Sequence, residues 1–360
     1  MDRKIKVALI FGGKSVEHEI SLQSAENVFE AIDKTRYDVI LIGIDKDGLW
    51  HLVTPAIFRG KERWQEQDQV IFFPHPEQGQ LLNLSQGKLI GPVDVVFPLL
   101  HGPLGEDGTI QGMLKLMHVP FVGAGVLGSA IGMSKEATKR LLREAGIPVV
   151  NFLSIHSPLD LSFQEVVKQI GLPFFVKPAN LGSSVGISKV KREEGFLPAL
   201  QNAFQYDETV LLEEYIEGQE IECSVLGNDN PIVSIPGEIV PQHEFYSYEA
   251  KYLDEKGAIL LIPARLPKKT AEEIQKIALL SFKALYCQGM ARVDFLVRKK
   301  REIFVNEINT IPGFTKISMY PKLWEASGIS YPELINRLIG LALERFEKEK
   351  NLKTHYQFTE

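Results

Sequence analysis

Cysteine is scarce in this chain of 360 residues, and its scarcity removes several classes of protein from consideration. Cys223 and Cys287 are the only two cysteines, and they do not form a CxxC pair. A disulfide framework and a structural zinc site are therefore both unexpected. Long apolar runs are also lacking: no stretch approaches the roughly 18 apolar residues of a membrane span, and the early run Val7–Phe11 is too short for the core of a signal peptide. We expect a cytoplasmic protein without a membrane partner.

An excess of positive charge is lacking as well. The formal net charge is -6, and charged residues make up 24% of the chain against 44% for hydrophobic residues. Such a chain has no general attraction to nucleic acid or to anionic membranes, and we expect neither as a partner. A chain of this length exceeds one compact core, so two or three domains are expected.

Two common nucleotide-binding fingerprints are missing near the N-terminus. The stretch FGGKSVEHEIS at 11–21 contains Gly-Lys-Ser, the tail of a P-loop, but Ala8 stands where a P-loop requires its first glycine. A G-x-G-x-x-G sequence does not follow the first strand either, which argues against a dehydrogenase. What remains is Glu17 at a strand–helix turn, where a carboxylate can bind an ammonium group. A solvated first helical turn explains the same residues, and this stretch alone leaves both interpretations open.

Strands and helices alternate over the first third of the chain, which predicts a parallel sheet with crossover helices. Ligands of such sheets bind beyond the carboxyl ends of the strands, where two loops at 12–21 and 101–108 lie. Apolar periodicity predicts strands at 4–11, 37–44, 92–100, 209–216, 220–226 and 231–239. It predicts helices at 16–31, 135–145, 193–204 and 270–286, and a closing helix from 331.

The stretch KPANLGSSVG at 177–186 follows a strand and precedes another. Lys177 at the strand end, with Ser183 and Ser184 in a glycine-rich loop, predicts a hairpin flap that closes over phosphates with its amides and hydroxyls. A strand rather than a helix follows, so this is not a Walker loop. An ordinary Gly/Ser turn remains the alternative.

The stretch ARVDFLVRKKREIFVNEIN at 291–309 predicts two antiparallel strands. If residues 300–301 form the turn, Asp294 faces Glu307 and Arg292 faces Asn309, and all four side chains lie on one face. Two carboxylates and an amide oxygen suit Mg²⁺ bound to phosphates.

Arg292 beside this oxygen cluster can stabilise negative charge that develops on a reacting centre, and the following turn offers the backbone amide of Gly313. An exposed polar strand face with cross-strand salt bridges is the alternative interpretation.

Six segments, in order between residues 12 and 321, together resemble the ATP-grasp superfamily and, within it, the D-alanine–D-alanine ligase family. They are GGKSVEHEISLQSA, HGPLGEDGTIQG, KPANLGSSVGISKV, YEAKYLD, ARVDF and NEINTIPGFTKISMYP. The resemblance implies an α/β (α+β) ATP-grasp fold in three parts. These are an N-terminal open parallel, Rossmann-like domain at 1–124, a central subdomain with the glycine-rich flap at 125–212, and a C-terminal subdomain with the metal site and a mobile loop at 213–360, the last two with mixed or antiparallel sheets.

The resemblance also implies an activity and its partners. ATP would phosphorylate one D-alanine, and the amine of a second D-alanine would displace phosphate to give D-alanyl-D-alanine for peptidoglycan synthesis. Two Mg²⁺ ions, or Mn²⁺ in their place, would assist, and ATP would be the co-substrate. The family further suggests a homodimer.

Site residues follow from the resemblance position by position. ATP binding is implied for Lys135, Lys177, Ser183, Ser184, Glu213, Glu214, Tyr215, Ile216, Glu220, Lys251 and Asn306. Catalysis is implied for Glu17, Ser183, Tyr252, Arg292 and Gly313. The two D-alanine subsites would involve Glu17, His101, Arg292, Gly313, Ser318 and Met319. The metal ligands would be Asp294, Glu307 and Asn309.

Two rival functions stay open. One is a related ligase whose product is D-alanyl-D-lactate or D-alanyl-D-serine, or which joins another acid and amine; the EAKY stretch at 249–252 favours an amine acceptor. The other is a non-catalytic nucleotide-binding module. Such a module would be expected to lack a metal ligand or Arg292, whereas Arg292, Asp294, Glu307 and Asn309 are all present in this chain.

Overall fold

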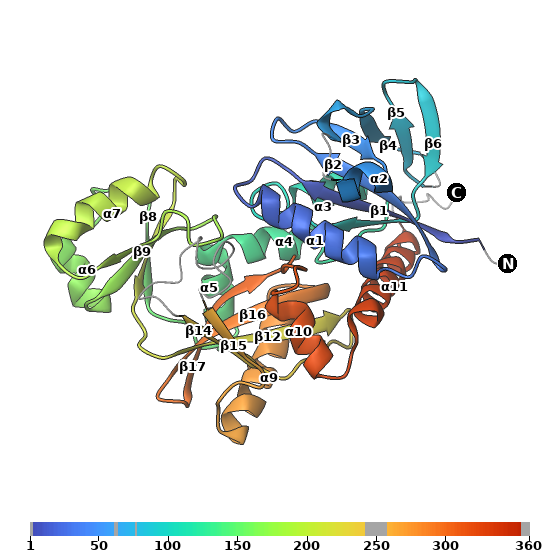
Figure 1. Ribbon diagram of the computed structural model, residues 1–360. Coiled ribbons are helices and arrows are strands. Elements are labelled where there is room, and N and C mark those ends of the chain that lie inside the picture. The colour runs from blue at the N-terminus through green and yellow to red at the C-terminus, as the bar shows by residue number, and fades with distance from the viewer. Residues whose placement is uncertain (1–2, 61–63, 76–77, 242–257, 354–360) are drawn as a thin grey trace, which may run out of the picture.

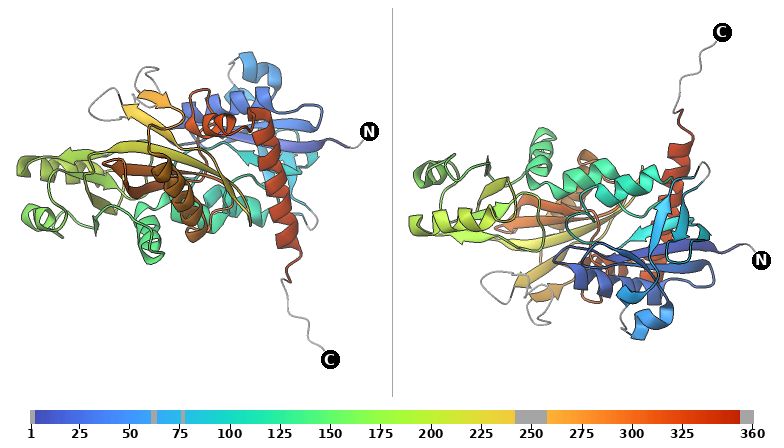
Figure 2. Two further views of the ribbon diagram at one scale, coloured as in Figure 1. Left: turned by 90° about the horizontal axis from the view of Figure 1, so that it is seen from below. Right: turned by 90° about the horizontal axis from the view of Figure 1, so that it is seen from above.

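The computed structural model describes residues 3–60, 64–75, 78–241 and 258–353. These residues form three bodies arranged in a row. Figure 1 shows the central subdomain at one end, the N-terminal sheet at the other, and the largest sheet between them, and both views of Figure 2 agree. None of the helices within the described ranges is long and apolar enough to cross a membrane.

The N-terminal sheet is mostly parallel, as predicted. Its strand order is β3-β2-β1-β7, in which β1 runs parallel to β2 and β7 while β3 pairs antiparallel with β2. The antiparallel edge strand and a separate antiparallel sheet, β4-β5-β6, were not predicted, because strands of four or five residues show too little periodicity. The bounds are β1 (Ile5–Gly12), β2 (Tyr37–Ile44), β3 (Trp50–Val53), β4 (Val70–Phe73), β5 (Gln80–Asn83), β6 (Lys88–Pro92) and β7 (Val95–Pro98).

The turn after β1 directs the chain into helix α1 (His18–Ala31). Gly12 has a φ of 89°, and a Cβ atom there would lie 2.2 Å from the carbonyl oxygen of Ile44, so only glycine fits. Its amide donates to Ser21 Oγ at 2.7 Å, which ties the strand end to the first turn of the helix. Glu17 is consequently held at the start of α1, at the carboxyl end of the sheet. Two further helices, α2 (Pro55–Gly60) and α3 (Thr109–Leu116), belong to this domain.

The central subdomain is an antiparallel sheet of order β10-β9-β11-β8, with two helices packed against it. The predicted hairpin on either side of the glycine-rich loop is confirmed, since Ser188 pairs with Val176. Ser162 and Glu165 form a capping box that starts α6, which explains the sharp beginning of that helix. The bounds are β8 (Phe152–Ile155), α6 (Phe163–Ile170), β9 (Phe174–Pro178), β10 (Ser188–Val190), α7 (Phe196–Ala203) and β11 (Val210–Glu214).

The largest sheet has the order β15-β14-β12-β16-β17, with β13 paired to β12. The predicted pairs Asp294–Glu307 and Arg292–Asn309 are confirmed, but the predicted turn at 300–301 is wrong. Arg298 pairs with Glu302, so the loop has three residues, 299–301. A β-bulge at 306 then shifts the register by one residue and restores the expected pairs.

The remaining bounds complete this sheet and its surroundings. They are α4 (Val126–Met133), α5 (Lys135–Glu144), β12 (Gln219–Gly227), β13 (Ile232–Val233), β14 (Gly237–Pro241), β15 (Ala258–Leu261), α9 (Lys268–Ala284), β16 (Gly289–Arg298), β17 (Glu302–Asn309), α10 (Met319–Ala326) and α11 (Tyr331–Lys350).

Helix α11 joins the last part of the chain to the first. Its buried residues Leu334, Ile335 and Leu338 belong to one apolar core together with strands β1, β2 and β7. Arg345 is buried and donates from Nη2 to the carbonyl oxygen of Phe121 at 2.7 Å. This shared core fixes the N-terminal sheet against the largest sheet. The domain boundaries at 124/125 and 212/213 stay predictions.

Candidate active site

A cleft of about 730 Å³ lies where the three bodies meet. Residues from the N-terminal domain, the glycine-rich flap, the segment after β11 and the largest sheet all line it. Every predicted site residue that the structure describes is among them; the predicted Lys251 and Tyr252 lie outside the described residues. The structure thus brings the predicted residues together, while their individual roles stay predictions.

Three carboxylates stand side by side across three strands of the largest sheet. Glu222 of β12 pairs with Asp294 of β16, which pairs with Glu307 of β17. Arg292 Nε and Nη2 donate to the two oxygens of Asp294, each at 2.7 Å, and Asn309 Nδ2 donates to Asp294 Oδ2 at 3.0 Å. Sequence reasoning missed Glu222, although the alternation along its strand could have indicated that it shares a face with Glu220.

The oxygen cluster fits a hard divalent cation by its donor chemistry. Within the described ranges, no group of three or more His, Cys, Asp or Glu side chains is placed to hold a metal ion. The predicted ligands are two carboxylates and one amide, so they are not a group of that kind. The Asn309 amide now directs Nδ2 to Asp294, and a half-turn of the amide would present its oxygen instead. Asp294, Glu307 and Asn309 are adjacent on the paired strands β16 and β17, and carboxylate and amide oxygens are what Mg²⁺ binds.

A buried cluster of two lysines and one glutamate lies in the wall of the cleft, which Lys177 and Glu213 line. Lys177 Nζ is 2.6 Å from Glu213 Oε2, and Lys139 Nζ is 3.3 Å from Glu213 Oε1. Lys139 also donates to the backbone oxygen of Asn306, in the bulge of β17, at 3.1 Å. Burial lowers the pKa of Lys139 to about 8, with the charge of Glu213 acting in the opposite direction. Burial alone would raise the pKa of Glu213, but the two ammonium groups hold it below its usual value.

Lys139 was not predicted as a site residue. It follows the predicted Lys135 by four positions in α5, and that spacing places the two lysines on one face of the helix. Lys135 Nζ donates to the carbonyl oxygen of Leu181 at 2.6 Å and lies 3.5 Å from Glu307 Oε2. Helix α5 therefore contacts both the base of the flap and the oxygen cluster.

The glycine-rich flap touches the N-terminal domain directly. Ser183 Oγ donates a short hydrogen bond to Glu17 Oε1 at the start of α1. Ser183 and Ser184 have φ values of 54° and 59°, a left-handed conformation that costs energy for residues other than glycine. The contact joins two of the residues for which the resemblance implies a part in catalysis, and these residues are 166 positions apart in the chain.

The segment 213–216, which the resemblance implies binds ATP at the adenine, spans the end of β11 and the two residues after it. Glu213 faces the two lysines, and Glu214 accepts from Asn151 Nδ2 at 2.8 Å, so both side chains have structural partners. The Tyr215 ring packs against Phe175, with ring centroids 5.9 Å apart, and Lys189 Nζ lies 3.5 Å from the Tyr215 centroid. Because these side chains have other partners, we expect the backbone groups of residues 215–216 to make the predicted contacts with adenine.

His101 supports the turn that carries Gly313. Its Nδ1 donates to the carbonyl oxygen of Ile311 at 3.2 Å, and its Nε2 lies 3.3 Å from Ser24 Oγ. Ser24 Oγ also accepts from the amide of Phe314 at 3.2 Å. Burial lowers the pKa of His101, which favours the neutral ring; with Nδ1 as the donor to Ile311, Nε2 of that ring can accept from the hydroxyl of Ser24.

Ser318 and Met319, which the resemblance implies receive the second D-alanine, lie at the start of α10. Ser318 Oγ accepts from the amide of Thr315 at 2.9 Å, and a Cβ atom on Gly313 would approach it to 2.7 Å. Met319 is buried in an apolar cluster with Ile239 and Leu323 while still lining the cleft.

Glu106 is a residue of the cleft that sequence reasoning missed, although its loop HGPLGEDG was singled out. Its Oε2 accepts from the amide of Gly102 at 2.7 Å. Burial, reinforced by the charge of Glu17, raises the pKa of Glu106 to about 8, while Arg292 opposes the shift. The direction of this shift favours the protonated form of the carboxyl group in the folded protein.

This raised pKa predicts a stability that depends on pH. Between its unfolded pKa near 4.5 and about 8, Glu106 holds a proton only in the folded state, so stability falls as the pH rises through that window. Relative to a Glu106→Gln variant, the wild type should lose on the order of a few kcal/mol of unfolding free energy between pH 5 and pH 8. Urea unfolding of both proteins across this range checks it, and parallel pH profiles would contradict it.

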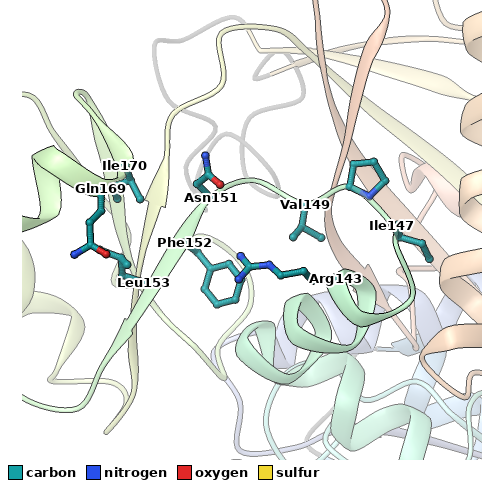
Figure 3. Close-up of a pocket in the computed structure, with 9 residues that line it drawn as sticks. Arg143, Ile147, Val149, Asn151, Phe152, Leu153, Gln169 and Ile170 are labelled. Atoms are coloured by element: carbon teal, nitrogen blue, oxygen red, sulfur yellow. The ribbon is translucent and has the colours of Figure 1, made fainter.

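A second hollow, of about 410 Å³, lies near the end of α5 and the segment that leads into β8. Figure 3 shows its lining, with the Arg143 guanidinium over the ring of Phe152 at 4.6 Å. None of the predicted site residues lines it. We therefore place the chemistry in the larger cleft.

The fold is that of the ATP-grasp ligases. The Coxiella burnetii D-alanine–D-alanine ligase superimposes with a TM-score of 0.87 at 39% identity, covering 97% of each chain. The VanG D-Ala:D-Ser ligase of Enterococcus faecalis superimposes with a TM-score of 0.85 at 36% identity, covering 94% of this chain and 100% of that one.

Sequence comparison identifies the family. Residues 6–124 match the family model "D-ala D-ala ligase N-terminus" and residues 141–340 match "D-ala D-ala ligase C-terminus". The chain is 51% identical over 360 residues to a D-alanine–D-alanine ligase of Oceanobacillus iheyensis, covering 98% of both. It is 49% identical over 363 residues to D-alanine–D-alanine ligase A of Escherichia coli K12, covering 98% and 99%. The chain belongs to the D-alanine–D-alanine ligase family.

Proposed function

We propose that the chain is an ATP-dependent ligase that joins two D-alanines into D-alanyl-D-alanine, with ADP and phosphate as the other products, in peptidoglycan precursor synthesis. One observation carries this proposal beside the family membership. The cleft brings the carboxylate of Glu17 into contact with the flap serine Ser183, and it also contains the cluster of Arg292, Asp294 and Glu307.

The chemistry explains why the cleft carries both cations and carboxylates. The carboxylate of an amino acid is a poor electrophile, and transfer of the ATP γ-phosphoryl group to it supplies a leaving group. Lys135 and Lys177 neutralise phosphate charge during that transfer. When bound, two Mg²⁺ ions (or Mn²⁺) held by Asp294, Glu307 and Asn309 would add charge neutralisation on the phosphoryl oxygens. The segment from Glu213 to Glu220 and the amides of the flap hold the nucleotide.

The second step is attack by the amine of the second D-alanine on the acyl phosphate. The carbonyl oxygen becomes negative as the tetrahedral centre forms, and Arg292 with the Gly313 amide stabilises it. Collapse of this centre breaks the C–O bond to phosphate and leaves the peptide bond. Glu17 binds the ammonium of the first D-alanine and His101 lies near its carboxylate, while Ser318 and Met319 receive the second.

Closure of the site protects the intermediate, because an acyl phosphate hydrolyses when water enters. In our proposal the hydrogen bond from Ser183 to Glu17 is one of the contacts that close the site, and it is present in the structure. In our proposal Tyr252 completes a trio with these two residues and, with Ser183, accepts a proton from the incoming amine, while Lys251 approaches the phosphates. The enzyme acts in the cytoplasm as a homodimer.

A ligase with D-serine as the acceptor is the second candidate, because the VanG D-Ala:D-Ser ligase shares this fold at a TM-score of 0.85. The two candidates differ in the second subsite rather than in the nucleotide residues. Product identity therefore separates them, and overall fold does not.

The test is phosphate release from ATP and Mg²⁺ with D-alanine, L-alanine, D-alanine plus D-serine, or D-alanine plus D-lactate, with products identified by mass. We expect release with D-alanine alone and a D-alanyl-D-alanine product. Release only with another acid–amine pair would keep the ATP-grasp mechanism but overturn the assignments of Glu17 and Tyr252. The absence of turnover with every pair would contradict the proposal.

A further inference from the structure

We propose that Glu222 is a positioning residue that holds the Arg292 guanidinium in place by serving as its second carboxylate acceptor. Glu222 Oε2 lies 2.8 Å from Arg292 Nε, although the hydrogen on that nitrogen is directed to Asp294 Oδ1 at 2.7 Å. The side chain of Glu222 is 9% exposed, so its charge is withdrawn from water beside the guanidinium.

The Nε–H group of Arg292 has two carboxylate acceptors within hydrogen-bond distance, Asp294 and Glu222. Nε carries a single hydrogen, which cannot point fully at both carboxylates. Asp294 now receives both Nε and Nη2, yet in the proposed reaction the same carboxylate is a metal ligand. A carboxylate that turns its oxygens toward a cation weakens its bonds to the guanidinium. Glu222 then accepts from Nε, and Arg292 keeps its orientation.

The sheet makes Glu222 suitable for this task. Strand β12 lies between β14 and β16, so its backbone is paired on both sides, and Glu222 is opposite Asp294 in the ladder. A side chain on an inner strand has little freedom to move away from its cross-strand neighbours. Arg292 consequently lies between Asp294, whose carboxylate can turn to bind a metal ion, and Glu222, whose carboxylate remains bonded to the guanidinium.

The inference rests on the proposed function to the extent that Arg292 stabilises the oxyanion. The experiment compares Glu222→Gln with Glu238→Gln, which removes another buried carboxylate from the same sheet. Glu238 bonds Gln219 Nε2 at 2.8 Å and the Arg265 amide at 3.2 Å instead of Arg292. Arg292→Lys and the double variant with Glu222→Gln complete a double-mutant cycle on kcat.

We expect Glu222→Gln to lower kcat by about 10-fold or more, below the roughly 10²–10³-fold loss of an oxyanion donor itself. The KM for ATP and the affinity for Mg·ADP by calorimetry should stay near the wild-type values, and Glu238→Gln should change kcat far less. In the Arg292→Lys background, Glu222→Gln should add little, because the residue acts through the arginine. Unchanged kcat in Glu222→Gln, or fully additive losses in the cycle, would overturn the inference.

A second readout does not depend on turnover. The Nε–Hε signal of Arg292, followed by nuclear magnetic resonance with ¹⁵N-labelled arginine, should remain protected from exchange in Asp294→Ala, which leaves no side-chain acceptor at that position, because Glu222 accepts the hydrogen. It should lose protection when Glu222→Ala is added. Loss of protection in Asp294→Ala alone would overturn the role of Glu222. An inactive wild type would overturn the proposed function, and the protection experiment would still test the role of Glu222.

Discussion

Replacing Arg292 with alanine is expected to lower kcat for D-alanine-dependent phosphate release by about 10²–10³-fold, the usual effect of removing one oxyanion donor. The guanidinium is the cation that contacts both Asp294 and Glu222, and no neutral side chain of alanine size can replace its charge or its parallel N–H groups. Steady-state kinetics under saturating ATP measure the effect. An activity within about threefold of wild type would contradict the assignment of Arg292.

Two controls separate catalysis from folding in this experiment. Arg292→Lys keeps the positive charge but not the parallel N–H groups, so its activity should lie between those of the wild type and the alanine variant. Arg140→Ala removes an exposed arginine whose partner is Glu136 at 2.6 Å, and it should leave kcat unchanged. Because Arg292→Ala removes a cation that contacts two neighbouring carboxylates, urea unfolding should accompany the kinetics to identify any loss of stability.

Replacing Glu213 with glutamine is expected to lower the free energy of unfolding by about 3–5 kcal/mol, the cost of breaking a buried ion pair from one side. Lys139 and Lys177 both bind this carboxylate, and Lys139 is completely buried, so the variant leaves two buried ammonium groups without their shared counter-ion. Urea denaturation measures the change. Wild-type stability in this variant would show that the cluster does not hold the charges that we assign to it.

A second substitution tests whether the unpaired charges cause this loss of stability. Lys139→Met in the Glu213→Gln background removes one of the two unpaired cations and should restore part of the lost stability. Glu333→Gln is the matched control: Glu333 pairs with Arg337 at 2.9 Å on the solvent side of α11, and its loss should cost less than about 1 kcal/mol. Additive losses in the Lys139→Met double variant would contradict the charge-balance explanation.

The strand pair that carries the oxygen cluster shows how far sequence reasoning extends. Alternation along β16 and β17 correctly predicted that Asp294 faces Glu307 and Arg292 faces Asn309. The predicted turn was nonetheless wrong by one residue, and the bulge at 306 compensates for the error. A turn with no glycine or proline offers no signal of its length, and a bulge inside an apolar–polar alternation is invisible until both strands are placed.

The residues that sequence reasoning missed share one property: each acquires its role from a contact that is remote in the chain. Glu222 reaches Arg292 only because β12 lies next to β16. Lys139 reaches Glu213 and the bulge of β17 only because α5 packs against them. Glu106 has a raised pKa only because the cleft buries it near Glu17.

The amino-acid sequence by itself determined the ATP-grasp fold, the family, the flap hairpin and the face shared by Arg292, Asp294, Glu307 and Asn309, because these depend on local periodicity and on ordered motifs. Only the tertiary structure decided which carboxylates are buried, which cation each one pairs with, and in which direction the pKa of each one is shifted. The physical reason is that burial and charge pairing depend on the distances between elements. Those distances are set by the packing of the whole chain, and no single segment contains them.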